Sequence, residues 1–122
     1  EQLGGAMTHN ATSGVAHFAV DDDRECLALI RELLSFLPSN NVDDAPRLAP
    51  AEHPDADVPA LDTIVPPSPN QPYDMLDVIH AVADDGYFLE VHQHYARNIV
   101  VGFARIDGRS VGIVANQPAV LA

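Results

Sequence analysis

Hydrophobic residues recur at helical spacing near the start of the chain, and the stripe they form is made by Cys26, Leu29, Ile30, Leu33 and Leu37. This spacing predicts an amphipathic helix whose stripe is buried, with Cys26 as a buried structural thiol. Asp22 and Glu25 have the spacing of a capping box at the helix start. Pro38 disfavours helical geometry at Leu37. We therefore predict a helix from about residue 22 to 37, after a small-residue loop over residues 1–20.

A second stretch with helical spacing follows in the last third of the chain, where Met75, Ile79, Val82 and Ala83 form an apolar face. Proline is tolerated in the first turn of a helix, so Pro72 can open this one. Gly86 is a suitable C-terminal stop. The pattern predicts a helix from Tyr73 to about Asp85 and then a short strand over Phe88–His92.

Two apolar runs near the end of the chain flank the dipeptide Asp107-Gly108. The first covers residues 99–106 and the second covers residues 109–114. Because an Asp-Gly pair favours the positive φ values of a type I′ turn, these runs predict a β-hairpin over residues 98–115.

Between the two predicted helices, prolines interrupt every periodicity from residue 38 to residue 72. Proline fixes φ and removes a hydrogen-bond donor, so residues 39–71 should be largely irregular, with one apolar island at Leu61–Val65. A connector of this length usually joins separate units.

The charge of the chain is strongly negative, and this excludes two classes of partner. Its 122 residues include 18 acidic ones against 6 basic ones, for a net charge of −12. Such a surface repels nucleic acid and anionic membranes. A single cysteine excludes an internal disulfide framework and suits a reducing compartment. Together with the lack of a signal-peptide pattern or a long apolar stretch, this leads us to expect a cytoplasmic protein.

No complete catalytic or metal-binding set of side chains is evident. His92 and His94 would face the same side of a strand, but zinc needs at least three converging ligands. Ser13 does not lie in a nucleophile elbow. The adjacent acids Asp84 and Asp85 follow a predicted helix, where carboxylates are usually solvated. We therefore predict no metal site and no catalytic side chain in this chain.

Several segments resemble, in the same order, the carboxyltransferase (beta) subunits of biotin-dependent acyl-CoA carboxylases, most of all the propionyl-CoA carboxylase group. The segments are Glu1–Ala6, Ser13–His17, Leu33–Asn41, Leu61–Pro66, Pro72–Met75 and residues 98–118, which read NIVVGFARIDGRSVGIVANQP. The resemblance covers nearly the whole chain.

The resemblance implies an α/β, crotonase-like (ClpP/crotonase) fold, of which this chain holds two helices, a connector and a hairpin. Residues 1–37 would end the N-terminal half of the subunit, residues 38–72 would connect the halves, and residues 73–122 would begin the C-terminal half. The subunit would form homo-oligomers and work with a biotin carboxylase and a biotin carboxyl carrier.

The implied reaction transfers CO₂ from carboxybiotin, held on a separate carrier, to the α-carbon of a short acyl-CoA such as propionyl-CoA or acetyl-CoA. Backbone N–H groups would stabilise the developing oxyanions. The glycine-rich segments that supply them in the family lie outside residues 1–122, and Gly4-Gly5 is not one of them. Asn116 and Gln117, in the turn Ala115–Pro118, are the substrate-binding candidates, although a capped strand end would explain the turn equally well.

Three alternatives stay open. The parent subunit could belong to a biotin-dependent methylmalonyl-CoA decarboxylase or to a transcarboxylase, which share the same half-reaction. The chain could also be a non-catalytic assembly module.

Overall fold

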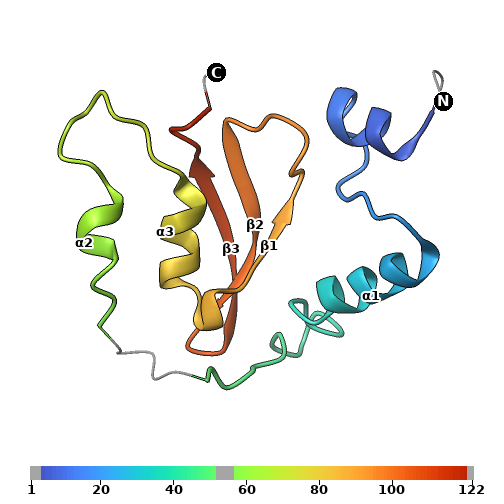
Figure 1. Cartoon of the computed structure of the whole chain (residues 1–122). Helices are drawn as coiled ribbons and strands as arrows, with labels where there is room; N and C mark the ends of the chain where they lie inside the picture. Colours follow the sequence, from blue (N-terminus) through green and yellow to red (C-terminus); the bar gives the residue numbers. More distant parts are fainter. Residues whose placement is uncertain (1–3, 52–56, 121–122) are drawn as a thin grey trace.

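A three-stranded antiparallel sheet lies at the centre of the molecule (Figure 1). Its strands are β1 (Phe88–Val91), β2 (Ile99–Ile106) and β3 (Arg109–Asn116), in the spatial order β1-β2-β3. The computed structural model describes residues 4–51 and 57–120. Within that part, one helix, α3 (Met75–Val82), lies along the sheet, and α1 (Asp23–Leu34) lies apart from it (Figure 1).

The predicted hairpin is confirmed. β2 and β3 pair from Ile106 opposite Arg109 to Ile99 opposite Asn116. Both turn residues have positive φ, 50° at Asp107 and 73° at Gly108, which is the type I′ geometry that matches the twist of the two strands. The predicted short strand is also present as β1, although it ends at Val91 because His92 has a φ of 59°.

Buried residues lie on both faces of the sheet, and one group lies between α3 and the face toward it. Alternate residues of β2, Val100 and Ala104, are buried there, together with Ile79 of α3. Because successive strand residues point to opposite faces, Val101 and Phe103 belong to the other face of the sheet. The buried apolar residues of the described part are Phe36, Ile79, Ala83, Leu89, Val100 and Ala104.

Helix α3 is shorter at both ends than predicted. It begins at Met75, because the Asp74 carboxylate accepts a hydrogen bond from the backbone N–H of Leu76 at 2.9 Å and caps the helix there. The prediction that Pro72 opens the helix is therefore wrong. The α-helix ends at Val82 and a 3₁₀ turn, η2 (Asp84–Gly86), follows, with Asp85 at a φ of 54°.

Helix α1 begins as predicted but ends earlier. The Asp22 carboxylate accepts from the N–H of Glu25 at 2.8 Å, whereas the Glu25 carboxylate accepts from Asp21 at 3.1 Å and not from Asp22. Beyond Leu34 the chain tightens into i→i+3 hydrogen bonds, so the α-helix does not reach Leu37.

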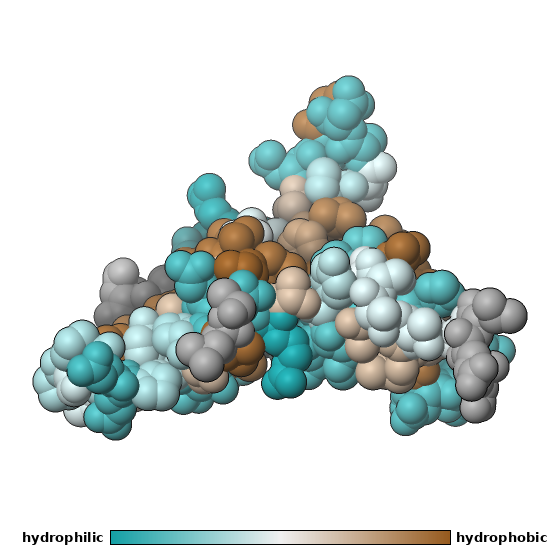
Figure 2. All heavy atoms as spheres, turned by 90° about the horizontal axis from the view of Figure 1, so that it is seen from above, coloured by the Kyte–Doolittle hydropathy of each residue, from teal (hydrophilic) through white to brown (hydrophobic). Residues whose placement is uncertain are grey.

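The prediction of a buried stripe on α1 is wrong for the described residues. No residue of α1 is buried, and Cys26 is exposed. Leu27 is 61% exposed and Ile30 is 47% exposed. The side chain that packs closely on the sheet here comes after the helix: the ring of Phe36 stacks on Phe103 of β2. Figure 2 shows hydrophobic surface exposed among hydrophilic regions on the face seen from above.

The prediction of a loop over residues 1–20 is wrong in its first part. Residues 6–12 are helical, and Thr8–Thr12 form a π-helical turn, η1. Asn10 is buried, and its side-chain amide donates to the carbonyls of Ala6 at 2.8 Å and Phe18 at 2.9 Å. This amide holds the turn against the segment that follows it.

The described part of the predicted connector is largely irregular, as expected. It contains one short helix, α2 (Leu61–Ile64), within the predicted apolar island. Residues 52–56 of the connector and Glu1–Leu3 of the first segment of family resemblance lie outside the described residues. No helix within residues 4–51 and 57–120 is long and apolar enough to cross a bilayer.

Candidate functional site

The two predicted substrate-binding residues lie where β3 ends, Asn116 as its last residue and Gln117 just after it, and Gln117 faces inward. Gln117 is 8% exposed. Its side-chain oxygen accepts from the N–H of Met75 at 3.0 Å, and its side-chain nitrogen donates to the Asp74 carboxylate at 2.7 Å. Its backbone N–H donates to the carbonyl of Asn98 at 2.8 Å. Gln117 therefore joins the end of β3 to the first turn of α3, and its amide is occupied by these contacts.

Asn116 lies on the opposite face and is exposed. It is the last residue of β3 and pairs with Ile99. Within the described part of the chain, its side chain makes no hydrogen bond. The structure therefore separates the two predicted residues, because Gln117 holds the turn and Asn116 remains available to a ligand.

A cavity of about 290 Å³ adjoins Gln117 at this end of the sheet, lined by Asp74, Leu76, Glu90, Gln93, Arg97, Val100, Gln117, Ala119 and Val120. Glu90 on β1 is a half-buried acidic residue in the lining of this cavity. Burial raises the pKa of Glu90, and the neighbouring carboxylate of Asp74 adds to the rise, while Arg97 opposes it. A carboxyl group held this way exchanges its proton closer to neutral pH than an exposed one does. The sequence did not predict the raised pKa of Glu90, because the charged groups around this residue come from three separate segments.

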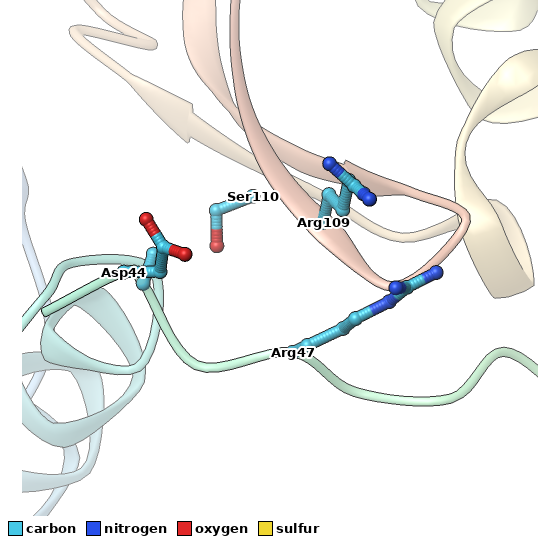
Figure 3. Close-up of a pocket in the computed structure, with 5 residues that line it drawn as sticks. Asp44, Arg47, Arg109 and Ser110 are labelled. Carbon is cyan, nitrogen blue, oxygen red and sulfur yellow. The ribbon is translucent and has the colours of Figure 1, made fainter.

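A second cavity, of about 300 Å³, lies between the connector and the hairpin and is lined by Asp44, Ala45, Arg47, Arg109 and Ser110 (Figure 3). Its charged groups do not converge. Arg47 is 2.7 Å from Asp107 in an ion pair, and Arg109 points away from Ser110, its neighbour on β3 (Figure 3). With the Asp44 carboxylate also present, the cavity has no net positive charge to hold an anion.

Asp84 and Asp85 both accept hydrogen bonds from backbone N–H groups; the expectation that they are solvated is wrong for Asp84, which is half-buried, and holds for Asp85, which is exposed. The Asp84 carboxylate accepts from the backbone N–H groups of both hairpin-turn residues, at 3.0 Å from Asp107 and 2.6 Å from Gly108. Asp85 accepts from the N–H of Ala51 in the connector at 3.0 Å. Leu48 also donates its N–H to the carbonyl of Gly108 at 3.0 Å. We call these contacts of the turn with η2 and the connector the turn clamp.

His17 and His92 serve as packing groups. The rings of His17 and His92 stack with their centroids 4.3 Å apart, and His92 donates Nε2–H to the carbonyl of Gly14 at 3.0 Å. No group of three or more potential ligands among the described residues could hold a metal ion. His92 and His94 also do not share a strand, because β1 ends before them.

The carboxyl transferase domain family matches the whole chain, residues 1–122. A propionyl-CoA carboxylase carboxyltransferase subunit from Haloferax mediterranei is 55% identical over 98% of the chain and 23% of that relative. The alpha subunit of methylmalonyl-CoA decarboxylase from Veillonella parvula is 53% identical over 100% of the chain and 24% of that relative.

A solved structure agrees with these matches. The transcarboxylase 12S structure, a hexamer assembly with methylmalonyl-coenzyme A and methylmalonic acid bound, superposes with a TM-score of 0.91 at 46% identity, over 98% of the chain and 23% of its own. The chain thus spans about a quarter of the length of these relatives. It belongs to the carboxyl transferase domain family.

Proposed function

We propose that this chain is part of a subunit that transfers CO₂ from carboxybiotin to the α-carbon of a short acyl-CoA, such as propionyl-CoA or acetyl-CoA. The observation that carries the proposal is a relative named propionyl-CoA carboxylase carboxyltransferase subunit, which is 55% identical across 98% of the chain. Its partners would be the acyl-CoA, a biotin carboxyl carrier with its biotin carboxylase, and further copies of the subunit. The 12S relative, described as a hexamer, supports the last of these.

The fold of the whole subunit would be crotonase-like, with residues 1–37 ending one half and residues 73–122 beginning the other. The Pro-rich connector between them and the separation of α1 from the sheet support this division. The chain would then contribute the junction between the halves and the first hairpin of the second half.

The proposed chemistry depends on positioned backbone amides. A thioester enolate and the ureido oxygen of biotin each need hydrogen-bond donors that are held in place before the charge develops. Gln117 cannot be one, because its amide is occupied. We assign the described residues no step on the biotin ureido group. Asn116 stays a candidate for substrate contact at the rim.

A decarboxylase or a transcarboxylase is the second candidate. The identity to the decarboxylase relative is 53%, against 55% for the carboxylase relative. These values are too close to separate the two, and the chemistry is common to both. The difference would lie in the partner proteins that supply or receive the carboxyl group.

The test is a carboxyl-transfer assay on the full-length subunit with its carrier, using acetyl-CoA, propionyl-CoA and methylmalonyl-CoA in parallel. Carboxylation of propionyl-CoA supports the proposal, whereas release of CO₂ from methylmalonyl-CoA alone favours the decarboxylase. The chain of residues 1–122 should be inactive in the same assay. Turnover by this chain would show that the oxyanion donors lie within it.

A further inference from the structure

Arg105, near the end of β2 and beside the hairpin turn, contacts the residues that follow α1 across a long separation in the sequence. Its Nη2 donates to the backbone carbonyl of Ser35 at 2.9 Å and to the Ser35 hydroxyl at 3.0 Å. Ser35 is the C-cap of α1. A cation at the C-terminal end of a helix also interacts favourably with the helix dipole, so Arg105 is well suited to hold this end of α1.

The guanidinium of Arg105 also stacks on an aromatic group. Its Cζ lies 4.0 Å from the centroid of the Phe36 ring. Phe36 is 2% exposed, and its ring stacks on Phe103 of β2 at 5.7 Å and on Tyr87 at 6.4 Å. Phe36 is thus the buried anchor on the face of the sheet opposite α3, and Arg105 covers it. We call Ser35, Phe36, Phe103 and Arg105 the junction cluster.

We propose that Arg105 is a positioning residue that fixes the end of the first half of the subunit on the first hairpin of the second half. The proposal rests on the proposed function and on the division into halves given above. Arg105 lies on β2, and β2 pairs along its whole length with β3, the strand that ends at Asn116. A loosened junction cluster would therefore let the two halves of a subunit shift against each other, and the donors that each half contributes to a site would move from the positions that the reaction needs.

The planar guanidinium is essential to this role, because it donates at its edge while its face lies on the ring. A lysine ammonium can donate to the Ser35 carbonyl but has no flat face to stack. The same hairpin offers a matched control. Arg109 has the same charge, is exposed, and contacts no residue of the junction cluster.

The experiment compares Arg105→Ala, Arg105→Lys and Arg109→Ala in the full-length subunit with its carrier. We expect Arg105→Ala to lower kcat by about tenfold or more with the KM for acyl-CoA changed by less than about threefold, since a small misplacement slows the chemistry. Arg105→Lys should recover only part of kcat, and Arg109→Ala should match the parent. Millimolar guanidinium should restore part of the activity of Arg105→Ala, an effect that a merely destabilised protein would not show.

Hydrogen exchange separates this proposal from the proposed function. Arg105→Ala should lose protection at the amides of Phe36 and Leu37, whatever reaction the subunit catalyses. Unchanged protection there would overturn the proposal, and so would an unchanged kcat or a loss of kcat that guanidinium does not restore. An inactive parent subunit with normal protection would instead count against the proposed function alone.

Discussion

The side-chain amide of Gln117 lies 2.7 Å from the carboxylate of Asp74, and this contact ties the end of β3 to the cap of α3. The oxygen of the same amide accepts from the N–H of Met75 at 3.0 Å, in the first turn of the helix. One buried side chain therefore gives the Asp74 carboxylate a second donor, beside the N–H of Leu76, and satisfies the N–H of Met75 at the helix end.

Replacing Gln117 with alanine should destabilise the fold by about 1–3 kcal/mol, because the part-buried N–H of Met75 would lose its acceptor and the Asp74 carboxylate one of its donors. Urea unfolding followed by circular dichroism measures this. Asn116→Ala is the matched control next to it and should change the free energy of unfolding by less than about 0.5 kcal/mol, since Asn116 is exposed. Equal effects of the two changes on the free energy of unfolding would contradict a structural role for Gln117.

Gly108 should not tolerate a side chain. Its φ is 73°, and an added Cβ would lie 2.2 Å from the carbonyl oxygen of Leu48 in the connector. We expect Gly108→Ala to cost about 1–3 kcal/mol from the backbone conformation alone, with a further loss as the connector moves away. The control is Gly112→Ala on the same strand pair, where an added Cβ meets nothing within 4 Å. A Gly108→Ala variant as stable as Gly112→Ala would refute the close packing of connector and turn.

Glu90 should make the fold less stable as the pH rises. Burial raises the pKa of this carboxyl above its ordinary value of 4.5. The folded chain thus holds the proton more tightly than the unfolded chain does. Its contribution to stability is then fully present below the ordinary value and lost as the pH rises through the folded value.

Glu90→Gln should remove this loss, so the variant gains stability over the parent as the pH increases from about 4 to 8. Unfolding free energies measured at several pH values check this. Asp62→Asn, which removes one negative charge at an exposed position on α2, is the control measured beside it. If the gain in unfolding free energy for Glu90→Gln shrinks as the pH rises, the predicted direction of the pH dependence is wrong.

The chain of residues 1–122 should self-associate, because α1 exposes an apolar face and Val114 on β3 is 78% exposed. Sedimentation at increasing concentration should show a growing average mass. Ile30→Glu on α1 should reduce that growth. Val42→Glu, at an exposed position outside α1, should leave it unchanged. A single monomeric species at high concentration would contradict this expectation.

Local signals accounted for the hairpin, because strand alternation and the Asp107-Gly108 turn act over a few residues. They placed α3 but missed its start, since the capping side chain of Asp74 is fixed by Gln117, far along the chain. Helical spacing also predicted that Leu37 is buried, whereas the buried residue is Phe36. Phe36 is buried by Phe103 and Tyr87, and no pattern within α1 contains that information.

The same limit applies to the candidate site. Two adjacent amides in a turn indicated a binding position, but only the structure shows that one of them is occupied. The roles of Asp84 and Glu90 were also missed, because each depends on groups from other segments.

The turn clamp has a consequence for the order in which the chain folds. The β2–β3 contacts join residues close in the sequence, so the hairpin can form early, at little cost in loop-closure entropy. The carboxylate of Asp84 can then bind the N–H groups of Asp107 and Gly108, and α3 is brought to the sheet. Arg47 must close a far longer loop to reach Asp107, so we expect the connector to dock last. Substitutions at Arg47 should then speed unfolding and leave the folding rate nearly unchanged.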